Sequence, residues 1–517
     1  MDRNRQLAIN LAAAGVAFAV NIGINFFLSP YIVRTVGVEA YGFWGLANNF
    51  INYATIITIA LNSMAGRFLA IEVQRNDWKA ANRYFSSIFF ANAIAVALML
   101  IPATLFVLNI NEFIRVPGEI ATDVKLLFGL IFINFFINMM ALAFSLAPFT
   151  KNMVYLRSLR KTESSLLKAG LLLFMFYFFE SRLWFLGLAA LVTGVYQTMF
   201  GFYYTSKLLP DIKLDHSKCE RRAIKELLSS GSWNVVNHLG RLLATGFDLL
   251  IANLFLGAAP MGVLALSRVI PSLIESMMAA FASVFTPEFT MLYAKNEMKN
   301  LTGAIRRSIK ILGLVVNVPV AVLIAFGQVF FRLWVPTQDA GLLHILSVIS
   351  VFAFVFAGAT NSLFSVFIVT NRLRTNSLLV LLTGLLNVVI VILLLKYTEL
   401  GLLAIAGVST ILITIRNLAF TVPFGAIYIG LPWHSFFPEV GKSVAGFSVI
   451  MVLGLLIQKA ATIDSWYSLL IAAFVTSAAG FAFNLLVLLN ASERRRAFDI
   501  VKKRVYSPRS NGKNGIE

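Results

Sequence analysis

The sequence predicts an all-α polytopic membrane protein of about 14 transmembrane helices. Two six-helix lobes related by an internal repeat are expected, followed by two C-terminal helices. Three observations support this fold class. Hydrophobic residues make up 59% of the 517 positions and charged residues only 13%, whereas about a quarter of a soluble domain is charged. Apolar runs of about 20 residues, enough for one crossing of a bilayer, recur along the chain. The chain also matches itself at a constant offset, which carries residue 37 onto residue 257.

The apolar runs are predicted to be helices because each crossing must satisfy its own backbone polar groups in hydrocarbon. The first run begins after Met1–Gln6 and continues past Phe27 with no small-residue cleavage site, so we expect a retained span and not a signal peptide. In order, the expected spans are 7–33, 41–70, 81–108, 124–148, 153–179, 183–206, 227–256, 260–292, 305–331, 341–369, 375–396, 400–428, 441–460 and 466–490.

The self-match divides these spans into two like-oriented halves. The segment 37–42 (GVEAYG) reappears as 257–262 (GAAPMG), and without a gap 75–79 (RNDWK) falls on 295–299 (KNEMK). Like-oriented repeats in a membrane protein are typical of alternating access to a site between the halves. The expected organisation is an N-terminal lobe at 1–206, a C-terminal lobe at 207–430, two more spans at 431–490 and a basic cytoplasmic tail at 491–517.

The net charge of +19 follows membrane topology and does not indicate nucleic-acid binding. Of the 43 Lys and Arg residues, the expected periplasmic ones are Arg34, Arg115, Lys125, Arg182, Arg332, Lys396 and Lys459. Those assigned to spans are Arg67, Arg241, Arg268 and Arg416, and every other one is assigned to the cytoplasmic side. This bias is the positive-inside rule. It predicts a multi-pass protein of the bacterial inner (cytoplasmic) membrane with both termini in the cytoplasm.

Disulfide and metal chemistry are not expected. Cys219 is the only cysteine, which excludes a disulfide within the chain and a multi-thiol metal site. The four histidines are scattered without ligand spacing. No metal site, no other cofactor and no catalytic residue is therefore predicted.

Polar residues form matching stripes in the two halves. Asn48, Asn52 and Thr55 are four and three residues apart, which places them on one face of the second span. The repeat offset sends this stripe to Arg268, Ser272 and Glu275 of the eighth span, and sends Asn21 and Asn25 to Arg241 and Thr245 of the seventh. Such faces predict a central hydrophilic cavity; the alternative is hydrogen bonding that holds packed helices together.

Charged residues of spans seven and eight occur at matched depths. Arg241 and Glu275 are equally far before and after the turn at residue 258, and Asp248 and Arg268 are likewise equidistant from it but closer. Because intramembrane charges pair or face water, the hypotheses are two structural ion pairs or charges that line a cavity. Arg416, in the second half of the twelfth span, is a further candidate cation.

The opening of the chain resembles a known family. The segments 25–34 (NFFLSPYIVR) and 37–44 (GVEAYGFW) are similar to bacterial polysaccharide biosynthesis membrane proteins. These are the oligosaccharide repeat-unit (O-antigen and exopolysaccharide) flippases of the multidrug/oligosaccharidyl-lipid/polysaccharide exporter superfamily. The similarity extends over the chain in length, span count and paired halves, but only the N-terminal part, through the second span, resembles the family specifically. No motif identifies the sugar.

The resemblance implies a V-shaped pair of lobes around a cationic cavity and no enzymatic activity. Members of the family move polyprenyl-diphosphate-linked oligosaccharides to the outer leaflet, beside membrane lipids and with polysaccharide polymerase and glycosyltransferases as partners. Arg241, Arg268 and Arg416 are the expected diphosphate ligands. Amides and aromatic rings for the sugar are expected from Asn21, Asn25, Asn48, Asn52 and Trp44, with Thr55 beside them. Asp248 and Glu275 would compete for the arginines or couple transport to protons or sodium.

Three other functions remain open at this point. A cation-coupled multidrug exporter of the same superfamily would favour a more acidic or apolar cavity and twelve spans. A membrane polymerase or ligase would need an acidic or histidine cluster on a large periplasmic loop, and no such loop is expected here. A purely structural protein would leave the intramembrane charges unexplained. Neighbouring glycosyltransferase genes would favour the flippase, and an isolated gene would favour the drug exporter.

Overall fold

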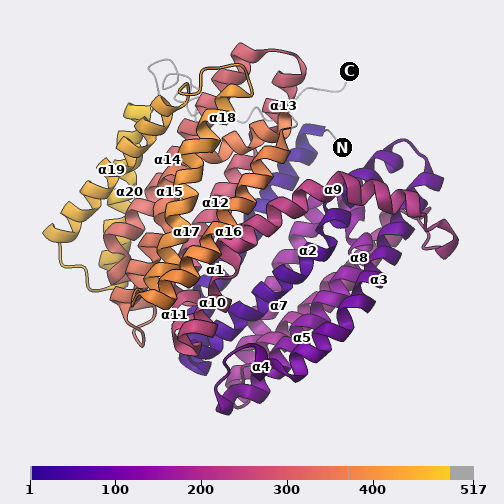
Figure 1. The fold of residues 1–517 in the computed structure, drawn as a ribbon, viewed down its shortest axis with the longest axis horizontal. Coiled ribbons are helices and arrows are strands. Elements are labelled where there is room, and N and C mark those ends of the chain that lie inside the picture. Colours follow the sequence, from indigo (N-terminus) through magenta and orange to yellow (C-terminus); the bar gives the residue numbers. More distant parts are fainter. Residues whose placement is uncertain (1–2, 371, 489–517) are drawn as a thin grey trace, which may run out of the picture. The chain divides into compact units, whose positions relative to one another are not determined.

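The protein is all-helical in the computed structural model, which describes residues 3–370 and 372–488. The predicted tail at 491–517 lies outside the described residues. Figure 1 traces the helices in chain order. The main ones are α1 (Arg3–Val36), α2 (Val38–Gln74), α3 (Trp78–Leu108), α5 (Ala121–Met140), α7 (Val154–Phe178), α8 (Phe185–Leu208), α9 (Arg221–Arg241), α10 (Asp248–Leu256), α11 (Ala258–Ser267), α12 (Val269–Ser283), α13 (Thr286–Ala294), α14 (Met298–Trp334), α15 (Ala340–Val369), α16 (Leu373–Tyr397), α17 (Leu402–Arg416), α18 (Val422–Ile427), α19 (Phe437–Ala460) and α20 (Trp466–Leu488).

The helix lengths and compositions confirm the polytopic fold class. In the described part of the chain, 13 helical segments are long and apolar enough to cross a membrane. Helix α7, the predicted fifth span, is also long enough to cross, because its 25 residues rise about 37 Å. It carries five charged residues (Arg157, Arg160, Lys161, Glu163 and Lys168), which lower its hydropathy below that of the others. This is why α7 stands apart from the 13 apolar segments.

The backbone repeats at the offset that the sequence predicts. Gly37, between α1 and α2, has φ +90°, and Gly257, between α10 and α11, has φ +101°. At both positions the chain reverses in a conformation that glycine adopts without a steric penalty. Asn76 (φ 58°) and Asn296 (φ 59°) follow in the same register, just before α3 and α14 begin. Equivalent turns at a constant offset show that the repeat is structural.

Contacts between Cα atoms divide the described chain into two compact units. Unit 1 comprises residues up to 273 together with 334–347 and 373–412, and unit 2 comprises 274–333, 348–372 and 413–488. These units are defined by contacts within the fold and do not coincide with the two halves of the chain. They do not test the expected lobe boundaries at residues 206 and 430, which stay a prediction. In unit 1, α7 packs between α1 and α8, and α5 packs between α3 and α8 (Figure 1).

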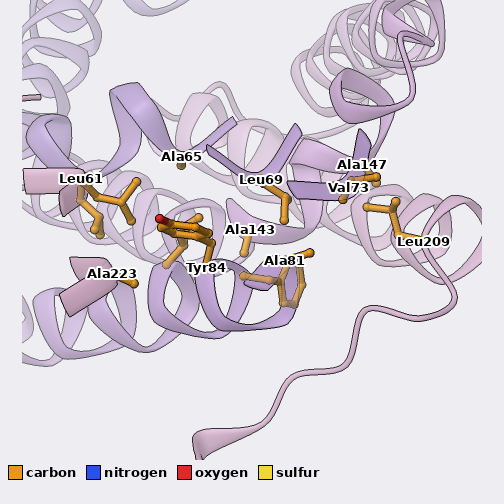
Figure 2. Packing of buried hydrophobic residues seen from close by; sticks show 13 residues of the cluster. Leu61, Ala65, Leu69, Val73, Ala81, Tyr84, Ala143, Ala147, Leu209 and Ala223 are labelled. Carbon is orange, nitrogen blue, oxygen red and sulfur yellow. The ribbon is translucent and has the colours of Figure 1, made fainter. Parts of the chain in front are cut away.

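One end of unit 1 is held together by an apolar cluster (Figure 2). The cluster joins Leu61, Leu69 and Val73 of α2 to Phe85 of α3 and Leu227 of α9, all of them buried. Because lipid tails are as apolar as these side chains, close packing stabilises the cluster, and not removal of the side chains from water. The first turns of α9 therefore pack directly against the N-terminal helices.

The segment between α8 and α9 is fixed to α3 by hydrogen bonds. Asn82 accepts from the backbone N–H of Lys213 (2.5 Å) and donates to the carbonyl of Asp211 (3.0 Å). The hydroxyl of Ser86 accepts from the N–H of Asp215 (3.2 Å). Hydrogen bonds from the hydroxyl and N–H of Ser217 lower the pKa of Asp215. The connection between the repeats is thus an ordered segment.

Unit 2 contains the two C-terminal helices. Helices α19 and α20 pack against each other, and Leu469 and Ala472 of α20 join Phe326 and Val329 of α14 in one apolar cluster. The buried Asn317 of α14 donates to the carbonyl of Ser443 in α19 at 2.7 Å. The additional pair of helices is therefore packed on α14.

Within unit 1, α2 and α11 cross at two residues that are equivalent in the repeat. A Cβ atom added to Gly42 would lie 2.8 Å from the Cα of Gly262, and one added to Gly262 would lie 2.2 Å from the carbonyl oxygen of Val38. The next equivalent pair, Gly45 and Ala265, is also adjacent. A residue that touches its own repeat equivalent lies next to the local pseudo-twofold axis, so this axis passes between α2 and α11.

Candidate functional site

The seventh span is interrupted in its middle. Helix α9 ends at Arg241, a π-helical turn covers Leu242–Gly246 (η4), and α10 begins at Asp248. In this turn the N–H of Phe247 bonds to the carbonyl of Leu242, five residues back. A π turn removes regular i→i−4 hydrogen bonds and is common at functional sites. The exposed backbone carbonyls of this turn need other donors.

Side chains from two other helices supply those donors. Asn387 of α16 donates to the carbonyls of Leu243 (3.2 Å) and Ala244 (3.1 Å). From α2, Asn49 (3.1 Å) and the hydroxyl of Tyr53 (2.7 Å) both donate to the carbonyl of Gly246. The ring of Tyr53 also stacks on Phe247, with centroids 4.6 Å apart. The polar backbone of the break is therefore held in place by α2 and α16.

The eighth span is interrupted at Arg268. Helix α11 ends at Ser267 and α12 begins at Val269. Pro271 has no N–H, so the carbonyl four residues earlier, that of Ser267, loses its helical partner. The hydroxyl of Ser347 in α15 donates to this carbonyl at 2.7 Å. Pro271 is thus the cause of the break, and Ser347 satisfies the freed carbonyl.

Arg268 joins the two breaks. Its Nη1 donates to the carbonyl of Thr245 in the π turn at 3.0 Å, and its Nη2 forms an ion pair with Oδ2 of Asp248. The Asp248 side chain is fully buried, whereas that of Arg268 is 22% exposed. Oδ1 of Asp248 is buried without a hydrogen-bond partner. The structure therefore contains the Asp248–Arg268 pair expected from matched depth.

The other predicted substrate-binding arginines also lie at helix interruptions. Arg241 is the last residue of α9, is exposed, and directly precedes the first π turn. Arg416 is the last residue of α17 and directly precedes a second π turn, Asn417–Thr421 (η5). Glu275 lies in α12 and is exposed. The pairing of Arg241 with Glu275 stays a prediction because these residues belong to different contact units.

The predicted stripe of α2 lies beside the first break. Thr55 Oγ1 is 3.4 Å from Nε2 of His238 in α9. Asn52 is exposed. Asn48 bonds within its own helix, to the carbonyl of Trp44 at 2.7 Å. The Thr55 contact places the polar face of α2 beside α9, and a role of the stripe in substrate binding stays a prediction.

The two predicted residues of α1 bond to α7 and within α1. Asn21 donates to the hydroxyl of Ser165 in α7 at 3.4 Å, and Asn25 donates to the carbonyl of Asn21 at 2.8 Å. Asn25 is exposed. These residues lie at the contact between α1 and α7, the fifth span.

The sequence analysis did not single out Lys168 as a site residue. Lys168 was counted with the cytoplasmic residues, but it is the fifteenth residue of α7, about 21 Å from the helix start. Its Nζ lies over the ring of Trp44 in α2, 4.3 Å from the centroid. The position of Lys168 near the middle of span 153–179 was the signal that could have found it. Asn49 and Tyr53 were missed because donors to a broken backbone have no sequence motif.

Among the residues that the structure describes, no three His, Cys, Asp or Glu side chains cluster in a way that could hold a metal ion. The arrangement is instead one of two broken helices, an ion pair between them and polar side chains on α2. Discontinuous helices with exposed backbone groups form substrate and ion sites in membrane transporters. The groups that these helices present there are guanidinium and amide groups, which are able to bind a ligand by charge and hydrogen bonds.

Comparison with known sequences finds a family and a relative. Residues 9–293 match the family described as polysaccharide biosynthesis protein. The chain is 29% identical over 496 residues to the uncharacterized membrane protein EpsK of Bacillus subtilis (strain 168), covering 95% of this chain and 97% of that one.

Solved structures show the same fold. The lipid II flippase MurJ, in an inward closed conformation, aligns with a TM-score of 0.65 and 12% identity over 96% of this chain and 99% of that one. A multidrug resistance MATE family transporter of the MOP superfamily, in an inward-facing conformation, aligns with a TM-score of 0.59 and 14% identity over 86% and 99%. Both structures are less than 25% identical to this chain, so they show a shared fold, which is that of a lipid II flippase and of a multidrug transporter. With the matching family covering more than half of its length, the chain belongs to the polysaccharide biosynthesis protein family.

Proposed function

We propose that this protein is a flippase that moves polyprenyl-diphosphate-linked oligosaccharide repeat units across the bacterial inner membrane for surface polysaccharide synthesis. Transport would proceed by alternating access to a polar site formed by spans two, seven and eight. Both termini would lie in the cytoplasm. The polymerase and glycosyltransferases of the same pathway would be its partners.

The observation that carries the proposal is the pair of helix breaks joined by Arg268. A diphosphate cannot cross hydrocarbon without polar contacts, and the strongest ones are charge-assisted hydrogen bonds from a guanidinium. The guanidinium of Arg268 is partly exposed and is held at the break by Asp248 and the carbonyl of Thr245. Arg241 precedes the same π turn. Two guanidinium groups at one interruption favour an anionic substrate over a cationic drug.

The similarity to named proteins supports the same substrate class. The family is described as polysaccharide biosynthesis protein, and the MurJ structure is described as a lipid II flippase. The two C-terminal helices packed on α14 fit a lipid-flipping branch of the superfamily better than a twelve-span drug exporter. The substrate class would thus be a glycan on a lipid diphosphate.

We also propose that Asp248 couples transport to an ion. Its Oδ1 is buried without a hydrogen-bond partner, while Oδ2 holds Arg268. A proton or sodium ion bound at Oδ1 would weaken the hold of Asp248 on Arg268 and release the guanidinium toward the diphosphate. Glu275 of α12 would be a second carboxylate that binds a proton or sodium ion.

The test is to replace Arg268 by Ala in a strain that depends on this protein. The expected result is that the protein remains in the membrane, at a level lowered because buried Asp248 loses its partner. Prenyl-linked repeat units should accumulate on the cytoplasmic side, and surface polysaccharide should be lost beyond what the lowered protein level explains. Lys should rescue poorly if two nitrogens contact the diphosphate. The matched control is Arg75→Ala, which removes a guanidinium that is 69% exposed. Normal surface polysaccharide in the Arg268→Ala strain would remove Arg268 from the site.

A further inference from the structure

Lys168 is a cation inside the N-terminal helices without an acidic partner. Among the described residues, its Nζ contacts the ring of Trp44, and no carboxylate forms an ion pair with it. By contrast, Arg160 on the same helix is paired with Glu163 at 2.6 Å, and Arg268 is paired with Asp248. An intramembrane cation ordinarily pairs or faces water. The Lys168 ammonium is therefore held by a weaker contact than these two arginines.

The contact between Lys168 and Trp44 can be exchanged for a better one. A cation over an aromatic ring is bound by the quadrupole of the ring. A charge-assisted hydrogen bond from the same ammonium to a phosphate or carboxylate oxygen is stronger. An anion that reaches this position would thus draw the ammonium away from the ring and expose the face of Trp44.

The surroundings suit a sugar. Ser165 is one helical turn before Lys168 and accepts from Asn21 at 3.4 Å. Asn48 is one turn after Trp44 in α2. Hydroxyl and amide groups of α7 and α2 therefore lie within one helical turn of the cation and of the aromatic residue, and Asn21 of α1 bonds to the α7 hydroxyl. Sugar hydroxyls bond to such groups, and the apolar C–H face of a sugar ring stacks on indole.

Helix α7 also offers a path to this position. Arg157 and Lys161 lie eleven and seven residues before Lys168, which puts all three on one helical face. Arg157 and Lys161 are exposed. In the described part of the chain neither of them is paired with a carboxylate. A basic stripe thus runs along α7 from its first turn to the Lys168–Trp44 contact.

We propose that Lys168 and Trp44 form a subsite for a sugar that carries an anion: the Lys168 ammonium leaves the ring to bind the anion, and the freed ring stacks on the sugar. This proposal deepens the proposed function and rests on it for the identity of the ligand as a glycolipid. The anion has two sources with the same chemistry, the phosphate attached to the first sugar or the carboxylate of an acidic sugar.

The experiment follows the ring of Trp44 by ¹⁹F NMR. The full-length protein is labelled with 5-fluorotryptophan and placed in lipid nanodiscs, and the Trp44 resonance is assigned with Trp44→Phe. Glucose 1-phosphate, glucuronate and glucose are titrated separately. Either anionic sugar should shift the Trp44 resonance saturably, and glucose at equal concentration should shift it far less. The anion that acts identifies the source. If neither anion shifts the resonance, the proposal is wrong.

Variants separate the subsite from general electrostatics. Lys168→Met should move the Trp44 resonance before any ligand is added and should weaken the anion titration at least tenfold, whereas Lys168→Arg should stay within about threefold of the wild type. Lys161→Met is the matched control, because it removes one cation from the same face without touching Trp44, and it should titrate as the wild type. Equal weakening in Lys161→Met, or an unchanged titration in Lys168→Met, would overturn the subsite.

The outcome is distinguishable from failure of the proposed function. If the wild-type protein does not move lipid-linked oligosaccharide but the Lys168-dependent response of Trp44 persists, the flippase proposal fails and the anionic-sugar subsite stands. If transport is present and Lys168→Met responds to anions as the wild type does, the subsite alone fails.

Discussion

The crossing of α2 and α11 gives a quantitative prediction for Gly262→Ala. The added Cβ would lie 2.2 Å from the carbonyl oxygen of Val38, whereas a carbon and an oxygen normally approach to about 3.3 Å. The two helices would have to separate by about 1 Å to restore that distance. Overpacking of this kind costs about 1–3 kcal/mol. Gly42→Ala, whose Cβ would lie 2.8 Å from the Cα of Gly262, should cost less.

The assay is equilibrium unfolding of the purified protein by SDS in mixed micelles. The double variant should lose less stability than the sum of the single losses, because both methyl groups force the same separation. Gly303→Ala is the matched control, since its Cβ meets nothing within 4 Å. There alanine should stabilise the helix by roughly 0.5–1 kcal/mol. If Gly262→Ala behaves like Gly303→Ala, the close crossing of α2 and α11 is refuted.

Three further predictions follow from the breaks and the charge bias. Each of the single variants Asp248→Arg and Arg268→Asp should lower the protein level, because breaking the pair costs about 3–5 kcal/mol of folding free energy. The double variant should restore the protein level but not transport. Full rescue of transport would show that the pair is only structural. Asn387→Leu should leave two carbonyls of the π turn without a donor and lower the free energy of unfolding by roughly 1–3 kcal/mol for each carbonyl. The same SDS titration measures this loss, and unchanged stability would contradict the assigned role of Asn387. Reporter fusions at Asn111 should report the periplasm and those at Lys213 the cytoplasm, and inversion of either would break the topology.

The sequence was sufficient for the helical, polytopic fold class because membrane crossings depend on local composition. Runs of apolar residues predicted the helices, and the turns at Gly37 and Gly257, equivalent in the repeat, lie where the repeat offset put them. The pairing of Asp248 with Arg268 followed from counting residues outward from one of these turns. Length, composition and periodicity carry this information without any knowledge of tertiary contacts.

The interruptions of spans seven and eight were not predicted. The π turn at Leu242–Gly246 is stabilised by Asn49, Tyr53 and Asn387, which come from distant parts of the sequence. No local pattern encodes such a turn. Pro271, the cause of the break at Arg268, is visible in the sequence. Proline also occurs in membrane helices that continue, however, so its presence does not predict a break. The break also depends on a nearby donor to the freed carbonyl, such as Ser347, which the sequence does not reveal.

The most direct test of the flippase account is a leaflet assay with purified protein in lipid vesicles. A polyprenyl-diphosphate oligosaccharide is incorporated in both leaflets, and an external glycosidase reports how much of it becomes accessible with time. The account predicts that wild-type protein makes the inner-leaflet pool accessible, whereas Arg268→Ala vesicles stay at the rate of protein-free vesicles. Protein-free rates for the wild type, in vesicles where the same protein transports a cationic drug, would contradict the account.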